Sequence, residues 1–76
     1  MVVYIMSEIH TIYFMENHGW TPVKARDWLK KHNYKPIKPL HRMGHELRYR
    51  LKDPKLFKTF TSKKISDGIY LVFGFR

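Results

Sequence analysis

The stretch DGIYLVFGF, residues 67–75, decides the fold. Asp67-Gly68 is a strong signal for a two-residue hairpin turn, because such turns need the positive φ angles that Asp and especially Gly tolerate. From Ile69 to Phe75 apolar side chains occupy both sets of alternating positions. A strand that is apolar on both sides lies in the middle of a sheet or at a contact between subunits. We therefore predict a strand at Ile69 to Phe75, either in the middle of the sheet or at a subunit contact.

Two further strands are predicted before this turn. The polar stretch Thr59 to Ile65 forms the other half of the hairpin. The stretch Glu46 to Lys52 alternates between apolar and basic residues with a period of two, and Asp53-Pro54 ends it. Its apolar face carries Leu47, Tyr49 and Leu51, and its basic face carries Arg48, Arg50 and Lys52.

One helix is predicted, from Pro22 to about His32. Thr21 can cap it with its hydroxyl, and proline suits the first helical position because it has no N–H to satisfy. Ala25, Leu29 and His32 fall on one face, together with a tryptophan at position 28. Asn33 can adopt the left-handed conformation that ends a helix.

The remaining elements complete a small sheet. Ile9 to Met15 and Val2 to Ile5 are rich in β-branched and aromatic residues, and Ser7-Glu8 can form a bulge or turn between them. Lys35 to Arg42 contains two prolines, which cannot donate to a ladder, so it is expected to be an edge strand. We predict one α+β domain over residues 1–76, in which one helix packs on a small antiparallel sheet in the order β-α-β-β-β-β.

Composition points to a polyanionic partner. The chain has 76 residues, with 15 Lys and Arg against 6 Asp and Glu, which gives a net charge of +9. Solubility alone is usually reached with a net charge of about 2–8 in a small domain. Cysteine is absent, which excludes disulfides and thiolate zinc sites and makes oligomerisation the natural reinforcement of so small a core. No apolar run approaches the ~20 residues of a membrane span, and the start lacks the basic flank of a signal peptide, so an intracellular protein is expected.

A series of spaced motifs carries a family resemblance. The residues are Trp20-Thr21, Ala25, Trp28-Leu29, His32, Leu47 to Arg50, Asp53-Pro54, Gly68-Ile69 and Val72 to Phe75. The series, which runs from about Ile12 to the end of the chain, resembles a short uncharacterised domain of tailed phages and of large DNA viruses and their satellites. That domain has the form W-T-x3-A-x2-W-L-x2-H … R-[FY]-R-x2-[DE]-P-x2-F … G-I-x-L-V-x-G-F. The resemblance implies a viral origin and a role in the virion or in replication, with the protein located in the virion or the host cytoplasm. Many relatives carry an acidic segment before the Arg-aromatic-Arg strand, whereas this chain has the more basic stretch His41 to His45 there.

The basic strand face is the first candidate site. Alternate residues of a strand stand about 6.5–7 Å apart, which is close to the spacing of phosphates along a nucleic-acid strand, and guanidinium groups hold phosphate oxygens with two hydrogen bonds. An ordinary solvated sheet face is the alternative interpretation. The candidate nucleic-acid-binding residues are Arg48, Arg50, Lys52, Lys35, Lys38, Arg42, Lys63 and Lys64, with Tyr49 as a surface for base stacking.

These observations favour a binding protein over an enzyme. We expect a homodimer that binds nucleic acid without sequence preference. DNA is expected rather than RNA, and single-stranded DNA is one form considered. The alternative is a virion module in which the apolar final strand and an exposed edge strand dock a capsid or core protein. The acids are scattered, and the histidines have no metal-ligand spacing, so no catalytic residue, metal or cofactor is expected; a ribonuclease using His and Lys is the enzymatic alternative.

Overall fold

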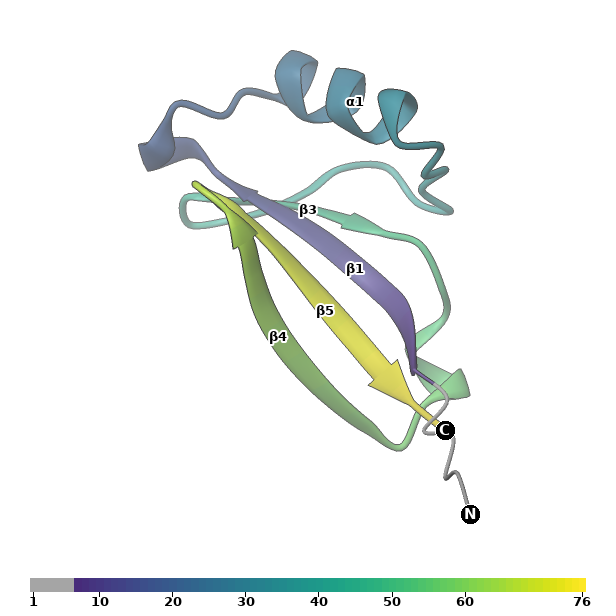
Figure 1. The fold of residues 1–76 in the computed structure, drawn as a ribbon. Helices are drawn as coiled ribbons and strands as arrows, with labels where there is room; N and C mark the ends of the chain where they lie inside the picture. Colours follow the sequence, from purple (N-terminus) through teal and green to yellow (C-terminus); the bar gives the residue numbers. More distant parts are fainter. Residues whose placement is uncertain (1–6) are drawn as a thin grey trace.

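The computed structural model describes residues 7–76, and the strand predicted at Val2 to Ile5 lies outside the described residues. The elements are β1 (Ser7–Met15), α1 (Pro22–Lys31), β2 (His41–Met43), β3 (Glu46–Arg50), β4 (Thr59–Ser66) and β5 (Ile69–Phe75), with short 3-10 turns at Glu16–His18 and Pro54–Leu56. Figure 1 shows one helix lying on one side of the sheet. The predicted α+β class and the order β-α-β-β-β-β are confirmed.

The strands form one antiparallel sheet in the order β2-β3-β1-β5-β4. Strand β5 has β1 on one side and β4 on the other, so its two apolar faces reflect a place inside the sheet. Strands β1 and β2 are both antiparallel to β3, which lies between them, so they run parallel to each other. Helix α1 is the crossover that such a parallel pair requires.

Local signals set the ends of α1 as predicted. The Thr21 hydroxyl accepts a hydrogen bond of 3.2 Å from the backbone N–H of Lys24, and Pro22 occupies the first turn. The helix ends at Lys31, one residue earlier than predicted, and Asn33 has a φ of 61°. Within residues 7–76 no helix is both long enough and apolar enough to cross a bilayer.

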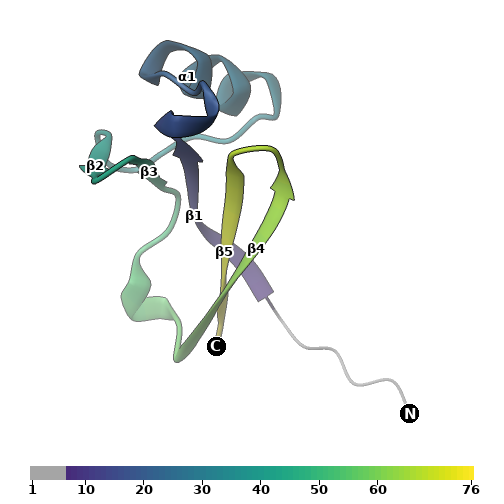
Figure 2. The same ribbon diagram turned by 90° about the vertical axis from the view of Figure 1, so that its left-hand side faces the viewer.

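The core lies between α1 and one face of the sheet, as the two views in Figures 1 and 2 show. Helix residues Ala25 and Leu29 pack there against side chains from the three inner strands. Those side chains are Ile12 and Phe14 of β1, Leu47 and Tyr49 of β3, and Ile69 and Leu71 of β5. Burying each large apolar side chain contributes about 1.5–3 kcal/mol, so this single layer is the main source of stability.

Several details of the elements differ from the predictions. Of the predicted strand Lys35 to Arg42, only His41 and Arg42 pair with β3, because the prolines deny the earlier residues a regular ladder, and the observed strand β2 continues to Met43. Strand β3 ends at Arg50, so Lys52 lies beyond the pleat that was expected to align it with the two arginines. The register of β1 shifts between Ile9 and Thr11, whereas Ser7-Glu8, where the bulge or turn was predicted, lies inside the strand.

Candidate nucleic-acid interface

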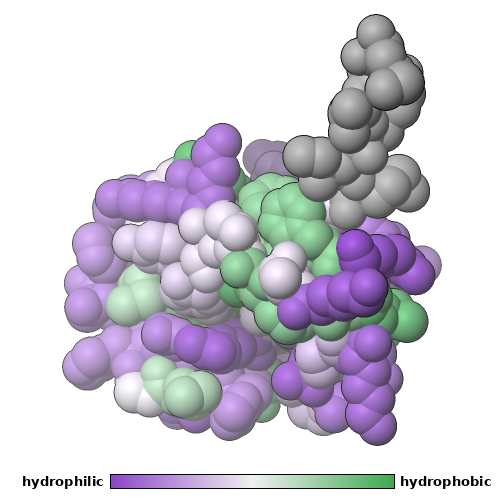
Figure 3. Space-filling model, turned by 90° about the horizontal axis from the view of Figure 1, so that it is seen from below, coloured by the Kyte–Doolittle hydropathy of each residue, from purple (hydrophilic) through white to green (hydrophobic). Residues whose placement is uncertain are grey.

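The sheet face opposite α1 carries a row of side chains that crosses all five strands. Residues directly paired between antiparallel strands point to the same side of a sheet. The pairings run from His41 through Arg48, Tyr13 and Tyr70 to Lys64, and we call this set the tyrosine row. Seen from the side away from α1, the surface has apolar atoms near its middle, with hydrophilic side chains around them (Figure 3).

Two stacked rings form the centre of the tyrosine row. The ring centroids of Tyr13 and Tyr70 are 4.9 Å apart, and the ring planes are tilted by only 7°. The guanidinium carbon of Arg48 lies 5.4 Å from the centroid of the Tyr13 ring, within the range of a cation–π contact. Both tyrosines are half-buried, so part of each ring faces solvent. The arrangement is a small aromatic platform beside a cation.

A hollow of about 480 Å³ adjoins this platform. It shares His41 and Arg48 with the tyrosine row, and Lys38 and Arg50 add two further cationic groups to its wall. Within residues 7–76 no acidic side chain lines it, and the other lining residues are His10, Thr11, Pro39 and Met43. A concave site lined by cations attracts anions more strongly than the same charges on a flat surface, because its low-dielectric walls focus the field.

The His10 imidazole forms one wall of the hollow. Its Nδ1 shares a hydrogen bond of 2.8 Å with the Thr11 hydroxyl, whereas its Nε2 is buried and has no partner within residues 7–76. Burial, assisted by the positive charge of Arg50, lowers the pKa of His10 below its usual value. The neutral imidazole packs against Phe57 and Phe60, with ring centroids 6.0 Å and 5.1 Å away.

Acidic neighbours change the predicted basic row. Arg48 Nε donates a hydrogen bond of 2.8 Å to Glu46, and the Lys52 ammonium is paired with Glu8. The hydrogen bonds from Lys52 and then Arg76 hold the pKa of Glu8 below its usual value. The prediction of a free row formed by Arg48, Arg50 and Lys52 is therefore wrong, because two of its three charges are paired.

The two arginines nevertheless remain available to a ligand. Arg50 takes part in no ion pair within residues 7–76. The pair between Arg48 and Glu46 is partly exposed, with 37% and 27% of the side chains accessible. A pair exposed to this degree contributes little free energy, so Arg48 can exchange Glu46 for a phosphate at small cost.

Other predicted residues lie away from the sheet face opposite α1, which we call the open face. Tyr49 is only 3% exposed, under α1, so the prediction that it stacks on a base at the surface is wrong. Arg42 is paired with Leu47 and Lys63 with Leu71, which puts both basic residues on the helix side of the sheet. Arg42 is also bound to a carboxylate, that of Glu16, at 3.2 Å.

The predicted basic residues therefore divide into two groups. The open face and its hollow bring together Arg48, Arg50, Lys38 and Lys64. The others, Lys52, Lys35, Arg42 and Lys63, lie outside this group. Tyr13 was missed as a site residue, although its position between two core residues of β1 is a period-two signal for the opposite face.

No protein-family model, no curated protein and no solved structure matches the chain. Among residues 7–76 no group of three or more His, Asp or Glu side chains is arranged to hold a metal ion. The features that define the site are therefore an aromatic platform, a cationic hollow and a large positive net charge.

Proposed function

We propose that this protein binds single-stranded nucleic acid, without reading its sequence, on the sheet face opposite α1. The observation that carries the proposal is the stacked pair Tyr13–Tyr70, flanked in the same row by Arg48 and Lys64. Proteins that bind single strands combine exposed aromatic faces with a basic groove, and each stacked base contributes about 1–3 kcal/mol. Every base has a π face, which makes such binding tolerant of sequence.

The strand backbone would follow the cationic hollow beside the tyrosines. Arg50 and Arg48 can each hold phosphate oxygens with two hydrogen bonds, and Lys38 adds a point charge at the rim. A base on the outer face of Tyr70 and a phosphate in the hollow are compatible, because the tyrosine row connects Tyr70 through Tyr13 and Arg48 to the hollow. DNA is the form we propose, in line with the resemblance to domains of DNA viruses.

Single strands suit this face better than duplexes. The bases of a duplex are stacked on one another, and their faces are not available to a protein ring unless they are extruded at a cost of a few kcal/mol. The tyrosine platform therefore favours bases that are already unpaired. A duplex can still use the cations, but it loses the stacking contribution.

The test is a comparison of strands and salt concentrations. Fluorescence anisotropy should show tighter binding of an oligothymidylate of about twelve nucleotides than of a duplex of equal length. If Lys38, Arg48, Arg50 and Lys64 each neutralise one phosphate, log affinity should fall with log salt with a slope of about −3 per chain. Equal affinity for single strand and duplex would contradict the stacking, and an affinity independent of salt would contradict the whole proposal.

A homodimer is the second part of the proposal. Strand β4 forms one edge of the sheet, and all of its residues are exposed, so a second copy can pair along it. Strand β5 gives no support for a dimer. It lies inside the sheet, which is one of the two places predicted for a strand with two apolar faces. Light scattering at high micromolar concentration should show twice the 9.3 kDa of one chain, and a monomer under those conditions would contradict this part.

Protein docking in a virion is the second candidate function. The exposed β4 edge supports it, with Phe60 and Ile65 exposed to 45% and 43%. The two functions separate in the double variant Arg48→Glu and Arg50→Glu. This variant should lose nucleic-acid binding if the open face is the site, whereas partner binding along β4 should survive.

A further inference from the structure

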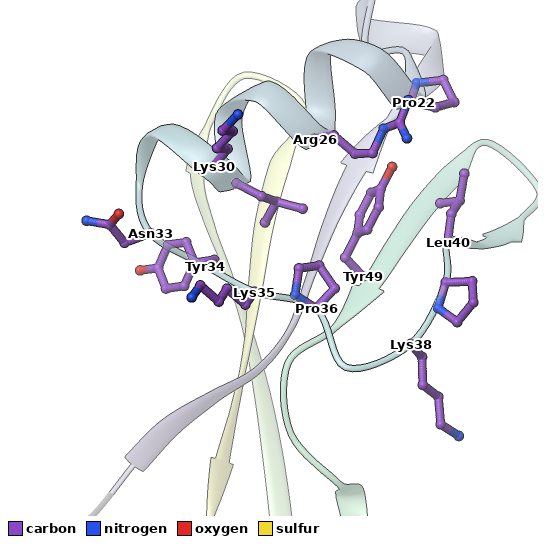
Figure 4. A pocket seen from close by; sticks show the side chains of 12 residues that line it. Pro22, Arg26, Lys30, Asn33, Tyr34, Lys35, Pro36, Lys38, Leu40 and Tyr49 are labelled. Carbon is purple, nitrogen blue, oxygen red and sulfur yellow. The ribbon is translucent and has the colours of Figure 1, made fainter.

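A second cavity lies on the helix side of the sheet, between α1 and the segment of residues 33–40. It has a volume of about 740 Å³ (Figure 4), within the range of about 300–1,000 Å³ that is usual for small-molecule sites. Apolar side chains form most of its surface, among them Pro22 and Leu29 from the helix and Pro36 and Leu40 from the facing segment. We call this cavity the helix groove.

Four cationic side chains surround the helix groove. Arg26 and Lys30 come from α1, and Lys35 and Lys38 come from the facing segment. No acidic side chain in the described part of the chain lines the helix groove. An apolar cleft rimmed only by positive charge is complementary to a ligand that has an apolar body and carries negative charge.

The hydroxyl of Tyr49 supplies an independent sign of a ligand. The side chain is 3% exposed, and its Oη is buried with no hydrogen-bond partner within residues 7–76. Figure 4 shows the hydroxyl pointing towards α1, at the end of the helix groove where Arg26 and Pro22 lie. Burial raises the pKa of Tyr49, so the group remains a neutral hydrogen-bond donor. Buried hydroxyls in proteins are nearly always bonded, and a ligand oxygen here would satisfy this one.

We propose that the helix groove binds one nucleotide that carries a 5′-phosphate. A phosphate oxygen accepts the Tyr49 hydroxyl hydrogen and the Arg26 guanidinium balances the phosphate charge, while the planar base lies on the apolar walls between Leu29 and Pro36. Phosphate matches four cations better than a singly charged carboxylate does. The site is separate from the open sheet face, although Lys38 and Pro39 line both cavities. The nucleotide can therefore be a free monophosphate or the 5′-terminal nucleotide of a strand bound on the open face.

Thymidine 5′-monophosphate is the probe for the free nucleotide. Added to the full chain at low salt and followed by ¹⁵N–¹H NMR, it should shift the amides of α1 and of residues 33–40. Tyr49→Phe keeps the ring and removes only the hydroxyl, and it should weaken binding about tenfold or more, as expected for a hydrogen bond to a charged group. Arg26→Gln should weaken binding to a similar degree. The matched control is Lys31→Gln, which removes one charge from the same helix at a position that does not line the helix groove, and its affinity should remain within about twofold of the wild type.

The strand-end source is tested with an oligothymidylate carrying or lacking a 5′-phosphate. A gain in affinity from the phosphate that disappears in Tyr49→Phe supports the strand end, and monophosphate binding without such a gain supports the free nucleotide. A wild-type protein that shows neither monophosphate binding nor a gain from the 5′-phosphate would overturn the proposal. Equal losses in Arg26→Gln and Lys31→Gln would overturn it as well. Monophosphate shifts confined to the strands around Tyr13 and Tyr70 would also overturn it, while leaving the function proposed for the open face intact.

Discussion

The rings of Tyr13 and Tyr70 lie 4.9 Å apart and nearly parallel, on the side of the sheet that faces away from α1. The two residues are 57 positions apart in the chain, since 70 − 13 = 57. Their contact exists only because β1 and β5 are neighbours in the register that pairs them. Both rings are half-buried, whereas Phe14 and Leu47 are fully buried, so the tyrosines contribute less to the core.

Replacing either tyrosine should weaken binding of single strands. Tyr13→Leu and Tyr70→Leu should each cost about 1–3 kcal/mol with an oligothymidylate, because Tyr70 offers the outer ring face to a base and Tyr13 holds that ring in place. The two losses should not add, since the rings are in contact. Anisotropy titration measures the affinities, and thermal melts of both variants check that the fold is intact. Unchanged affinity in a folded Tyr13→Leu variant would place the strand elsewhere.

Lys63 and Lys64 offer a matched pair of variants on one strand. Lys64 lies in the tyrosine row, whereas Lys63 is paired with Leu71 on the helix side, and both are exposed. Lys64→Gln should weaken binding about three- to tenfold at 50 mM salt and reduce the salt slope by about 0.7, which is the contribution of one phosphate. Lys63→Gln has the same net charge and should leave the slope unchanged. Equal losses would mean that the whole molecule attracts the strand without a preferred face.

Glu46 is expected to restrain binding. It accepts the hydrogen bonds of Arg48 beside the tyrosine platform and is the acid closest in sequence to that arginine. Glu46→Gln removes one negative charge from the face and frees the guanidinium, so affinity for a single strand should rise about two- to fivefold, in keeping with the small energy of an exposed pair. Isothermal titration calorimetry can measure the change. A weaker complex would show that Glu46 holds Arg48 in its binding geometry.

Removing the Tyr49 hydroxyl should stabilise the free protein. The hydroxyl is buried without a partner within residues 7–76, so Tyr49→Phe removes an unsatisfied group while the ring continues to fill the core. The free energy of unfolding should rise by about 1 kcal/mol, which urea denaturation followed by tryptophan fluorescence can measure. A loss of stability of similar size would mean that the hydroxyl has a partner in solution.

Stability should fall as the pH is lowered. The folded-state pKa of His10 lies below 6.5, so the unfolded chain takes up this proton first, and folding loses stability as the pH falls through 6.5. The folded-state pKa of Glu8 lies below 4.5, so its contribution is present above pH 4.5 and is lost as the pH falls further. Urea denaturation between pH 7 and pH 5 should show a slope that His10→Gln flattens. An identical slope in that variant would assign the loss to other groups.

The sequence predicted the elements better than the surfaces they build. Asp67-Gly68 and the cap at Thr21 are local signals, and the hairpin and the helix start where these signals predicted. The stacked tyrosines and the pairing of Lys52 with Glu8 depend on the register between distant strands, which local patterns do not contain. The contact between Arg48 and Glu46 could have been predicted from the sequence, because residues two apart on a strand share a face.

The helix groove had no comparable signal in the sequence. It depends on the irregular path of residues 33–40, where Pro36 and Pro39 prevent the strand that was predicted. The Tyr49 hydroxyl illustrates the same limit. Alternation placed its ring on the apolar side of β3, but only the position of the helix determines that its oxygen ends beside Arg26.

Ser7 and Phe75 are partners in the ladder between β1 and β5, so the described chain enters and leaves the sheet at the same end. Two copies can therefore be joined in tandem by a short flexible tether. Once one copy has engaged a strand, the tether holds the other at millimolar effective concentration, so avidity should exceed the affinity of either copy by about 10²–10⁴. Linked copies should therefore dissociate from a strand more slowly than a single domain does.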